Sequence, residues 1–340
     1  MDSFHTRLLR AALTALCLGA ILLVTACNRR AGSQEVAYVS AVQANLRDRV
    51  AAVYEKAGVV KNGEKVEVLD HDRRFVKVRT STGAIGWIEQ RYLVSQEVFD
   101  QLQQLTKENL NDPVQGMATT RNDTNLHVEP GRDTEHLYQI STVEKISLLK
   151  RATAEKPGTV AAPRPVAKSG EKKEAVAVVE DWWLVRDSHD RVGWVLGRMV
   201  DLDVPLDIAQ YAEGQRIVAF FVLNQVQDAD KKVAQYLTVL TEPKDGMPFD
   251  FNQIRVFTWN IKRHRYETAY RERMEGVLPV TVSQENFDKE GTLPVFIIRV
   301  RDDRGNVSER KYKLNTPIVR RVLAPGEEPA QPASRRKRNH

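Results

Sequence analysis

The cysteine whose chemical role the sequence defines best is Cys27. Ahead of it lie two basic residues, Arg7 and Arg10, and then an apolar stretch over residues 11–24. A charged start, a short apolar run and small residues at its end form the pattern of a secretory signal. The apolar stretch has about 14 residues, whereas a membrane-spanning helix needs about 20. We therefore predict that residues 1–26 are a signal peptide.

The end of this run resembles a bacterial lipobox, where the signal peptidase cuts before a cysteine that has first received a diacylglyceryl group. The resemblance implies that Cys27 becomes the N-terminus, carries lipid and continues into a tether, residues 27–35. The second cysteine, Cys17, would leave with the signal, so the mature chain would hold neither a disulfide nor a free thiol. Two alternatives are a plain secreted protein and an N-terminal anchor helix that is never cut.

The other residues that could do chemistry are scattered. No His-Glu-x-x-His run, no Gly-x-Ser-x-Gly turn and no Walker-type loop is present. A pair of carboxylates of the kind that lysozyme uses stays open, because the chain has 45 acidic residues. We predict no catalytic residue, no metal and no cofactor. The histidines that this prediction sets aside are His5, His71, His127, His136, His189, His264 and His340.

An internal repeat organises the middle of the chain. The first copy contains Asn45-Leu46-Arg47 and, later, Gly86-Trp87-Ile88. The second copy contains Asn125-Leu126-His127 and Gly193-Trp194-Val195 in the same order. Each copy alternates polar and apolar residues over short runs with turn signals between them, which predicts β-strands. The glycine before each tryptophan predicts a close approach of strands or a bulge.

One segment differs between the copies. From Val66 to Arg79 there are 13 positions, and from Ile146 to Arg186 there are 40, so the second copy holds 27 extra residues. The extra residues fall within 151–177, where proline, glycine and charged residues concentrate. We predict a disordered insertion there.

The ordered elements of both copies resemble the bacterial SH3 (SH3b) domain. The resemblance covers residues 36–94 and 114–202, and it implies two small SH3-like β-barrels that bind peptidoglycan or another cell-wall polymer. The sequence departs from the family after Arg47, where Asp48-Arg49-Val50 replaces the usual small residue and Gly-Pro. In the second copy His127 takes the place of the arginine. The resemblance to the SH3b family therefore predicts the fold of these segments better than it predicts their ligand.

Two aromatic residues are the predicted ligand-binding candidates. Trp182 and Trp183 are adjacent in a strand, so they point to opposite faces. Trp183 matches an inward valine of the first copy, and Trp182 matches Phe75. We therefore predict that Phe75 and Trp182 point outward, as flat faces on which sugars or peptides stack. Trp87 and Trp194 are assigned to the barrel cores, with a ligand platform as the alternative.

The remaining segments complete the predicted organisation. Residues 95–113 have helical spacing and predict a linker helix. Residues 203–323 alternate as several strands and predict a β-sandwich-like domain or an open β-sheet. The basic loop 262–265 in it is either a solvated turn or a polyanion contact. Residues 324–340 are rich in proline and arginine and predict a disordered basic tail, with a contact to anionic lipid, cell wall or nucleic acid as the alternative. The fold class is all-β.

These elements predict a membrane-anchored envelope lipoprotein that binds cell-wall polymer or an envelope protein and is not an enzyme. Papain-like wall peptidases often carry SH3b modules, but they need a Cys-His pair that a lipidated Cys27 cannot supply. The alternatives are an envelope hydrolase with its active site in the C-terminal domain and an assembly factor that binds another envelope protein by strand addition.

The net charge of +6 is spread over 51 basic and 45 acidic residues, which gives no nucleic-acid signature. The predicted partners are the membrane, through the N-terminal lipid, and a wall polymer or envelope protein. The sequence leaves the oligomeric state open. The predicted location is the envelope: the outer membrane facing the periplasm in a cell with two membranes, otherwise the outer face of the cell membrane.

The lipid prediction has a direct test. A Cys27→Ser variant should stay uncut and should incorporate no labelled fatty acid, because serine cannot form the thioether that precedes cleavage. The measurement is the electrophoretic shift and fatty-acid labelling in cells, with Cys17→Ser as the matched control that keeps both. Normal processing of Cys27→Ser would rule out the lipid anchor.

Overall fold

The computed structural model describes residues 35–160, 177–323 and residue 326. About 60% of the chain is in strands, which form three antiparallel sheets of seven strands each. The predicted signal peptide, nearly all of the tether, part of the predicted insertion and nearly all of the basic tail lie outside the described residues. Within the described part, no helix is long and apolar enough to cross a membrane.

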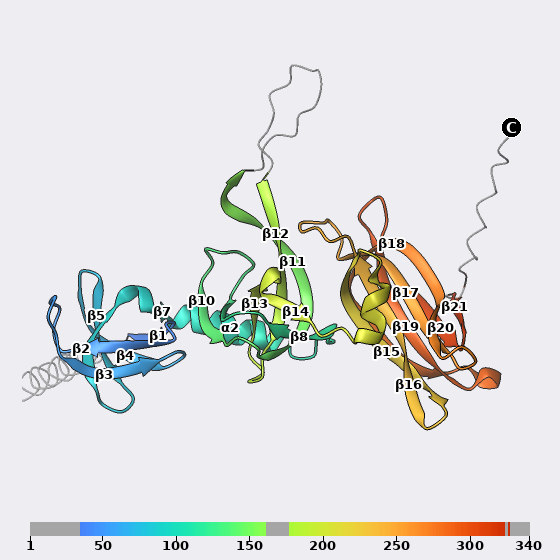
Figure 1. Cartoon of the computed structure of the whole chain (residues 1–340). Coiled ribbons are helices and arrows are strands. Elements are labelled where there is room, and N and C mark those ends of the chain that lie inside the picture. Colours follow the sequence, from blue (N-terminus) through green and yellow to red (C-terminus); the bar gives the residue numbers. More distant parts are fainter. Residues whose placement is uncertain (1–34, 161–176, 324–325, 327–340) are drawn as a thin grey trace, which may run out of the picture. The chain divides into compact units, whose positions relative to one another are not determined.

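The first sheet belongs to a compact unit that includes residues 43–93. Its strands follow the order β3-β2-β6-β5-β4-β1-β7 (Figure 1). Leu46, Val60 and Val78 are fully buried at its centre. The bounds are β1 Val36–Val39, β2 Gln43–Arg47, β3 Lys56–Lys61, β4 Lys65–Asp72, β5 Phe75–Thr80, β6 Ile85–Glu89, η1 Gln90–Tyr92 and β7 Leu93–Ser95.

The second sheet repeats this order strand for strand, as β10-β9-β13-β12-β11-β8-β14. Each strand takes the place of the strand seven numbers earlier, so the sequence repeat is also a repeat of topology. The bounds are β8 Gly116–Thr120, β9 Thr124–His127, β10 His136–Ile140, β11 Lys145–Val160, β12 Ala177–Arg186, β13 Val192–Leu196, η2 Gly197–Met199 and β14 Val200–Leu202.

The glycine before each tryptophan marks a close approach, as predicted. A Cβ on Gly86 would lie 2.8 Å from the Cβ of Leu46, and a Cβ on Gly193 would lie 2.8 Å from the Cβ of Leu126. This crowding shows which face of the strand points inward. The assignment of Trp87 to the barrel core is therefore wrong, since its neighbours Gly86 and Ile88, on the opposite face of β6, are the buried residues.

The predicted disordered insertion is wrong for the ten residues 151–160. They extend β11, which pairs with β12 from Ser147↔Arg186 onward and forms a long two-stranded hairpin (Figure 1). Pro157 and Gly158 are tolerated because the register shifts between Glu155 and Val160. Residues 161–176 of the predicted insertion lie outside the described residues.

The linker helix is α2, Gln96–Glu108. Val98 and Leu102 are buried, and Leu105 packs against Leu149 and Leu184 of the second sheet. The Thr106 hydroxyl also accepts a hydrogen bond of 3.0 Å from the amide of Val192. The helix is thus fastened to the second sheet.

The C-terminal region forms one seven-stranded sheet whose strands follow one another in chain order. Of the two predicted forms, the structure has the single sheet, a meander, and not the β-sandwich. The short helices before it are α3 Leu206–Ala209 and η3 Gln210–Ala212. The bounds are β15 Arg216–Asp228, β16 Lys231–Thr241, β17 Phe251–Asn260, β18 Arg265–Asn286, η4 Asp288–Glu290, β19 Thr292–Arg301, β20 Val307–Asn315 and β21 Ile318–Val322.

The second and third sheets share one hydrophobic core. A single cluster of buried side chains runs from Leu126 and Trp183 in the second sheet to Val256 and Phe296 in the third. A reciprocal amide pair adds to it, because Gln115 accepts from the amide of Val280 at 2.8 Å and donates to its carbonyl at 3.3 Å. Gln115 is fully buried. Residues 94–323 therefore fold as one body.

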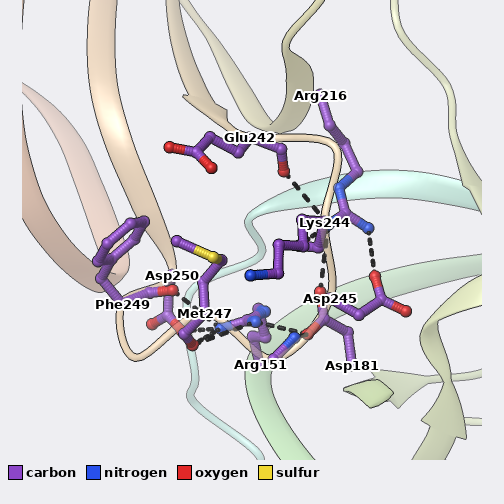
Figure 2. A network of polar contacts seen from close by, with 10 residues as sticks. Arg151, Asp181, Arg216, Glu242, Lys244, Asp245, Met247, Phe249 and Asp250 are labelled. Carbon is purple, nitrogen blue, oxygen red and sulfur yellow. Dashed lines mark hydrogen bonds and ion pairs between the residues drawn. The ribbon is translucent and has the colours of Figure 1, made fainter. Parts of the chain in front are cut away.

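A buried ionic network joins the same two parts (Figure 2). Arg151, at the start of the hairpin, lies 2.5 Å from Asp181 and 3.2 Å from Asp250. It also donates to the carbonyls of Met247 and Phe249. The side chains of Arg151 and Asp181 are each only 5% exposed. Burial raises the pKa of Asp250, although the hydrogen bond from the amide of Leu278 and the charge of Arg151 both oppose that rise.

Removal of Arg151 should destabilise this body strongly. An Arg151→Ala variant removes the ion-pair partner of Asp250 and leaves the buried Asp181 with only the more distant Arg216, at 3.4 Å. Loss of one partner from a buried ionic network costs about 3–5 kcal/mol of unfolding free energy. The matched control is Arg121→Ala, which breaks the exposed pair with Asp201 and should cost at most about 1 kcal/mol. Urea unfolding measures both. Equal losses of unfolding free energy in the two variants would show that the buried network stabilises the protein no more than an exposed ion pair does.

Candidate functional site

The two predicted ligand-binding residues are both buried. Phe75 is 4% exposed and Trp182 is 2% exposed. Phe75 lies beneath the guanidinium groups of Arg47 and Arg74, at 4.9 and 5.4 Å from its ring centre. Neither ring offers a free face to a sugar, so the prediction of exposed stacking platforms is wrong for both.

The alternation behind the prediction is nevertheless correct for Trp182 and Trp183. Trp183 belongs to the central core, whereas Trp182 lies outside that cluster. His127 covers Trp182, with the two rings edge to face at 5.2 Å. Two positions earlier in β12, Glu180 is also buried and accepts two hydrogen bonds of 2.6 Å from Arg132. The segment between β9 and β10 therefore closes the face that the sequence pattern leaves open.

A polar pocket of about 230 Å³ lies in the first unit. Its central group is Arg47, whose guanidinium lies 4.3 Å from the ring centre of Tyr54 and 3.2 Å from the carboxylate of Glu89. Glu89 also pairs with Arg91 at 2.9 Å. Stacking and ion pairing together hold Arg47 in place. The residues that line the pocket are Gln43, Ala44, Asn45, Arg47, Tyr54, Glu89 and Tyr92.

The loop that places Tyr54 is held by Asp48. The Asp48 carboxylate accepts a hydrogen bond of 2.8 Å from the amide of Glu55, and the Asp48 amide donates to the carbonyl of Glu55 at 3.0 Å. The bond from the Glu55 amide is the largest cause that lowers the pKa of Asp48. Asp48, which departs from the usual SH3b sequence after Arg47, thus closes the loop by its two hydrogen bonds with Glu55. The sequence gives no indication that Tyr54 and Tyr92 line a pocket, whereas Arg47 belongs to the repeated motif Asn45-Leu46-Arg47.

A second pocket, of about 550 Å³, lies in the C-terminal sheet where two hairpins end. His264 Nδ1 lies 2.7 Å from Asp228 Oδ2, and Trp259 Nε1 donates to the same oxygen at 2.7 Å. The sequence analysis had assigned His264 to a solvated turn or a polyanion contact. The lining residues are Asp207, Asp228, Ala229, Asp230, Lys231, Val233, Trp259, His264 and Tyr266.

One trio of potential metal ligands lies together among the described residues: Glu144, Asp187 and His189 have ligand atoms within 4.8 Å of one another. Asp187 already accepts hydrogen bonds of 2.9 Å from the amides of His189 and Arg191, and it pairs with the Arg191 guanidinium at 2.6 Å. A guanidinium thus takes the position beside the carboxylate that a cation would need. This trio does not fit a metal site.

Comparison with known proteins bears on the first unit and on the whole chain. The family model of the bacterial SH3 domain matches residues 42–94. No curated protein matches the chain. The first unit is therefore an SH3-like domain, as the resemblance implied.

Three solved structures are similar to much of the chain at low identity. NlpC2 from Trichomonas vaginalis is 9% identical, covers 85% of this chain and 96% of its own, and has a TM-score of 0.18. An NlpC/P60 family protein from Bacillus cereus is 11% identical, with coverages of 83% and 95% and a TM-score of 0.23. NlpC1 from Trichomonas vaginalis is 9% identical, with coverages of 82% and 87% and a TM-score of 0.17.

The sequence-based prediction that the chain is not an enzyme is contradicted by these NlpC and NlpC/P60 neighbours. At such TM-scores no residue role transfers from them. Both cysteines, Cys17 and Cys27, lie outside the described residues, so the described part of the chain contains no Cys-His pair.

His127 generates a pH-dependent prediction. Burial foremost, and then the neighbouring His136, lower its pKa to about 4, against 6.5 in the unfolded chain. The unfolded state therefore takes up a proton first as the pH falls, so the stability present above pH 6.5 declines between pH 6.5 and 4. By pH 4.5 the loss should be roughly 2 kcal/mol.

A His127→Gln variant should lose less stability than the parent between pH 7.5 and 4.5, by that same amount. Urea unfolding at both pH values measures it. The control is His189→Gln, an exposed histidine in a turn of the same body, which should follow the parent. If His127→Gln and the parent lost stability equally, His127 would titrate normally in the folded protein.

Proposed function

We propose that the protein binds a cell-wall polymer through its first SH3-like domain, and that the pocket around Arg47 is the binding site. The observation that carries this proposal is the fixed guanidinium. Arg47 is held by Tyr54, Phe75 and Glu89 and still borders an open pocket. Bacterial SH3 domains generally bind peptidoglycan, which gives the polymer class.

The chemistry of the pocket suits such a polymer. Glu89 pairs with Arg47 inside the pocket and with Arg91 beside it, so Arg91 helps to neutralise the carboxylate that Arg47 faces. The amides of Gln43 and Asn45 add neutral donors and acceptors for peptide groups and sugar hydroxyls. A preorganised arginine loses little freedom when it binds a carboxylate of the wall peptide.

The second copy keeps the topology but not the pocket. His127 stands where Arg47 stands, Leu196 replaces Glu89, and Met199 replaces Tyr92. His127 is neutral at physiological pH, because its pKa is lowered to about 4, and it packs on Trp182. In this proposal the second copy is a further SH3-like domain that supports the C-terminal sheet, and the first copy alone holds the wall.

The proposed location is the cell envelope, with lipid on Cys27 as the membrane anchor. Two or three acyl chains, at about 0.8 kcal/mol per buried CH₂, hold a protein on a membrane far better than one chain does. The tether after Cys27 would then present the first SH3-like domain to the wall.

Arg47→Ala should lower retention on purified sacculi by at least about tenfold, because it removes the charged centre of the pocket. The matched control is Arg79→Ala, which breaks another arginine–glutamate pair of the same domain, with Glu67, away from the pocket. Co-sedimentation measures retention, and melting curves confirm that both variants fold. Parent-like retention of Arg47→Ala would place the wall-binding surface elsewhere.

A further inference from the structure

We propose that the pocket at the hairpin ends of the C-terminal sheet is a hydrolytic site in which His264 acts as general base on water, oriented by Asp228, against an acyl ester carried on a sugar. The choice of a wall sugar rests on the proposed wall binding. The chemistry itself rests on the contacts of these two residues.

The two residues come from different hairpins. Asp228 ends β15, before the turn to β16, and His264 lies in the turn between β17 and β18, 36 positions away. The two arginines that flank His264, Arg263 and Arg265, both pair with Glu267. His264 has a left-handed φ of 48°, a conformation that a branched or bulky residue adopts at a cost. The turn thus directs its histidine across to Asp228.

The hydrogen bonds define the protonation of the imidazole. Asp228 is only 10% exposed and accepts from both His264 and Trp259. The bond from His264 and then that from Trp259 lower the pKa of Asp228, so this carboxylate is anionic. An anionic acceptor at Nδ1 requires the proton on Nδ1, which leaves the lone pair of Nε2 free. His264 is 68% exposed, so water can reach it.

The wall of the pocket is rigid and aromatic. Trp259 is fixed by its hydrogen bond to Asp228 and by an edge-to-face contact of 4.9 Å with Tyr266. Tyr266 is itself buried and donates to the carbonyl of Ala234 at 2.9 Å. An indole held in this way offers an apolar face for a sugar ring beside the imidazole.

The lining residues decide the type of reaction. None of the nine described residues that line the pocket is serine, threonine or cysteine, the side chains that most often form an acyl-enzyme in ester hydrolysis. Water is then the nucleophile. Its oxygen bonds to the acyl carbon while Nε2 of His264 takes its proton, and the ester C–O bond breaks as the sugar oxygen takes that proton back. The products are a carboxylic acid and the free hydroxyl, and no further reactant is needed.

The experiment follows acetate release from O-acetylated sacculi by the full chain. His264→Gln keeps a donor for Asp228 but cannot accept a proton, and it should lower the rate by about 10²-fold or more. Asp228→Asn should lower the rate similarly, because the histidine loses its orienting anion. The control His189→Gln should keep the parent rate. Melting curves of all variants separate loss of a base from loss of the fold.

Retention on sacculi, measured in parallel, separates this proposal from the proposed wall binding. His264→Gln should be retained like the parent, and Arg47→Ala should be retained poorly. The parent should release acetate from soluble acetylated fragments as well as from sacculi. No acetate release by the parent from either substrate would overturn the hydrolytic site, and so would a folded His264→Gln variant with the parent rate. Neither result would touch the binding proposal.

Discussion

The contact between Arg151 and Asp181 is the constraint on which the larger body depends. It fixes the base of the β11–β12 hairpin and, through Asp250 and the carbonyls of Met247 and Phe249, holds the β16–β17 loop of the third sheet against it. The guanidinium of Arg151 lies between the two carboxylates, and the amides of Gly246 and Leu278 donate further hydrogen bonds to them. With this network in place, the apolar side chains of two sheets can form one core. The second repeat and the C-terminal sheet are therefore packed on each other through this shared core.

The two repeats show how one topology serves two roles. Both place a glycine against the leucine of the second strand, since a side chain there would collide with it. They differ at the pocket, where a charged, solvent-facing group in the first copy gives way to a neutral histidine packed on an indole in the second. At this position the first copy thus has a charged side chain beside a pocket, and the second copy has a histidine that packs on Trp182.

Binding and chemistry are assigned to separate parts of the chain. The Arg47 pocket lies in the first compact unit, and the Asp228–His264 pocket lies in the second. A cation held by aromatic rings suits recognition, because its charge is permanent. An imidazole with one nitrogen committed to a carboxylate suits proton transfer, because its other nitrogen can both accept and return a proton. In the two proposals, binding and hydrolysis can therefore be tested by separate variants.

The sequence by itself determined the period of the strands, the two copies and the position of the linker helix. These follow from local alternation, turn residues and helical spacing, which need no knowledge of distant contacts. Only the tertiary structure decided which faces are covered. Trp182 points away from the core as the alternation indicated, yet His127 buries it. Arg151 begins what the composition indicated was a loop, but its partners Asp181 and Asp250 make it part of a strand. His264 pairs with Asp228 from another hairpin. Each of these outcomes depends on a partner 30 or more positions away, or on a neighbouring strand, and alternation along one strand carries no information about such partners.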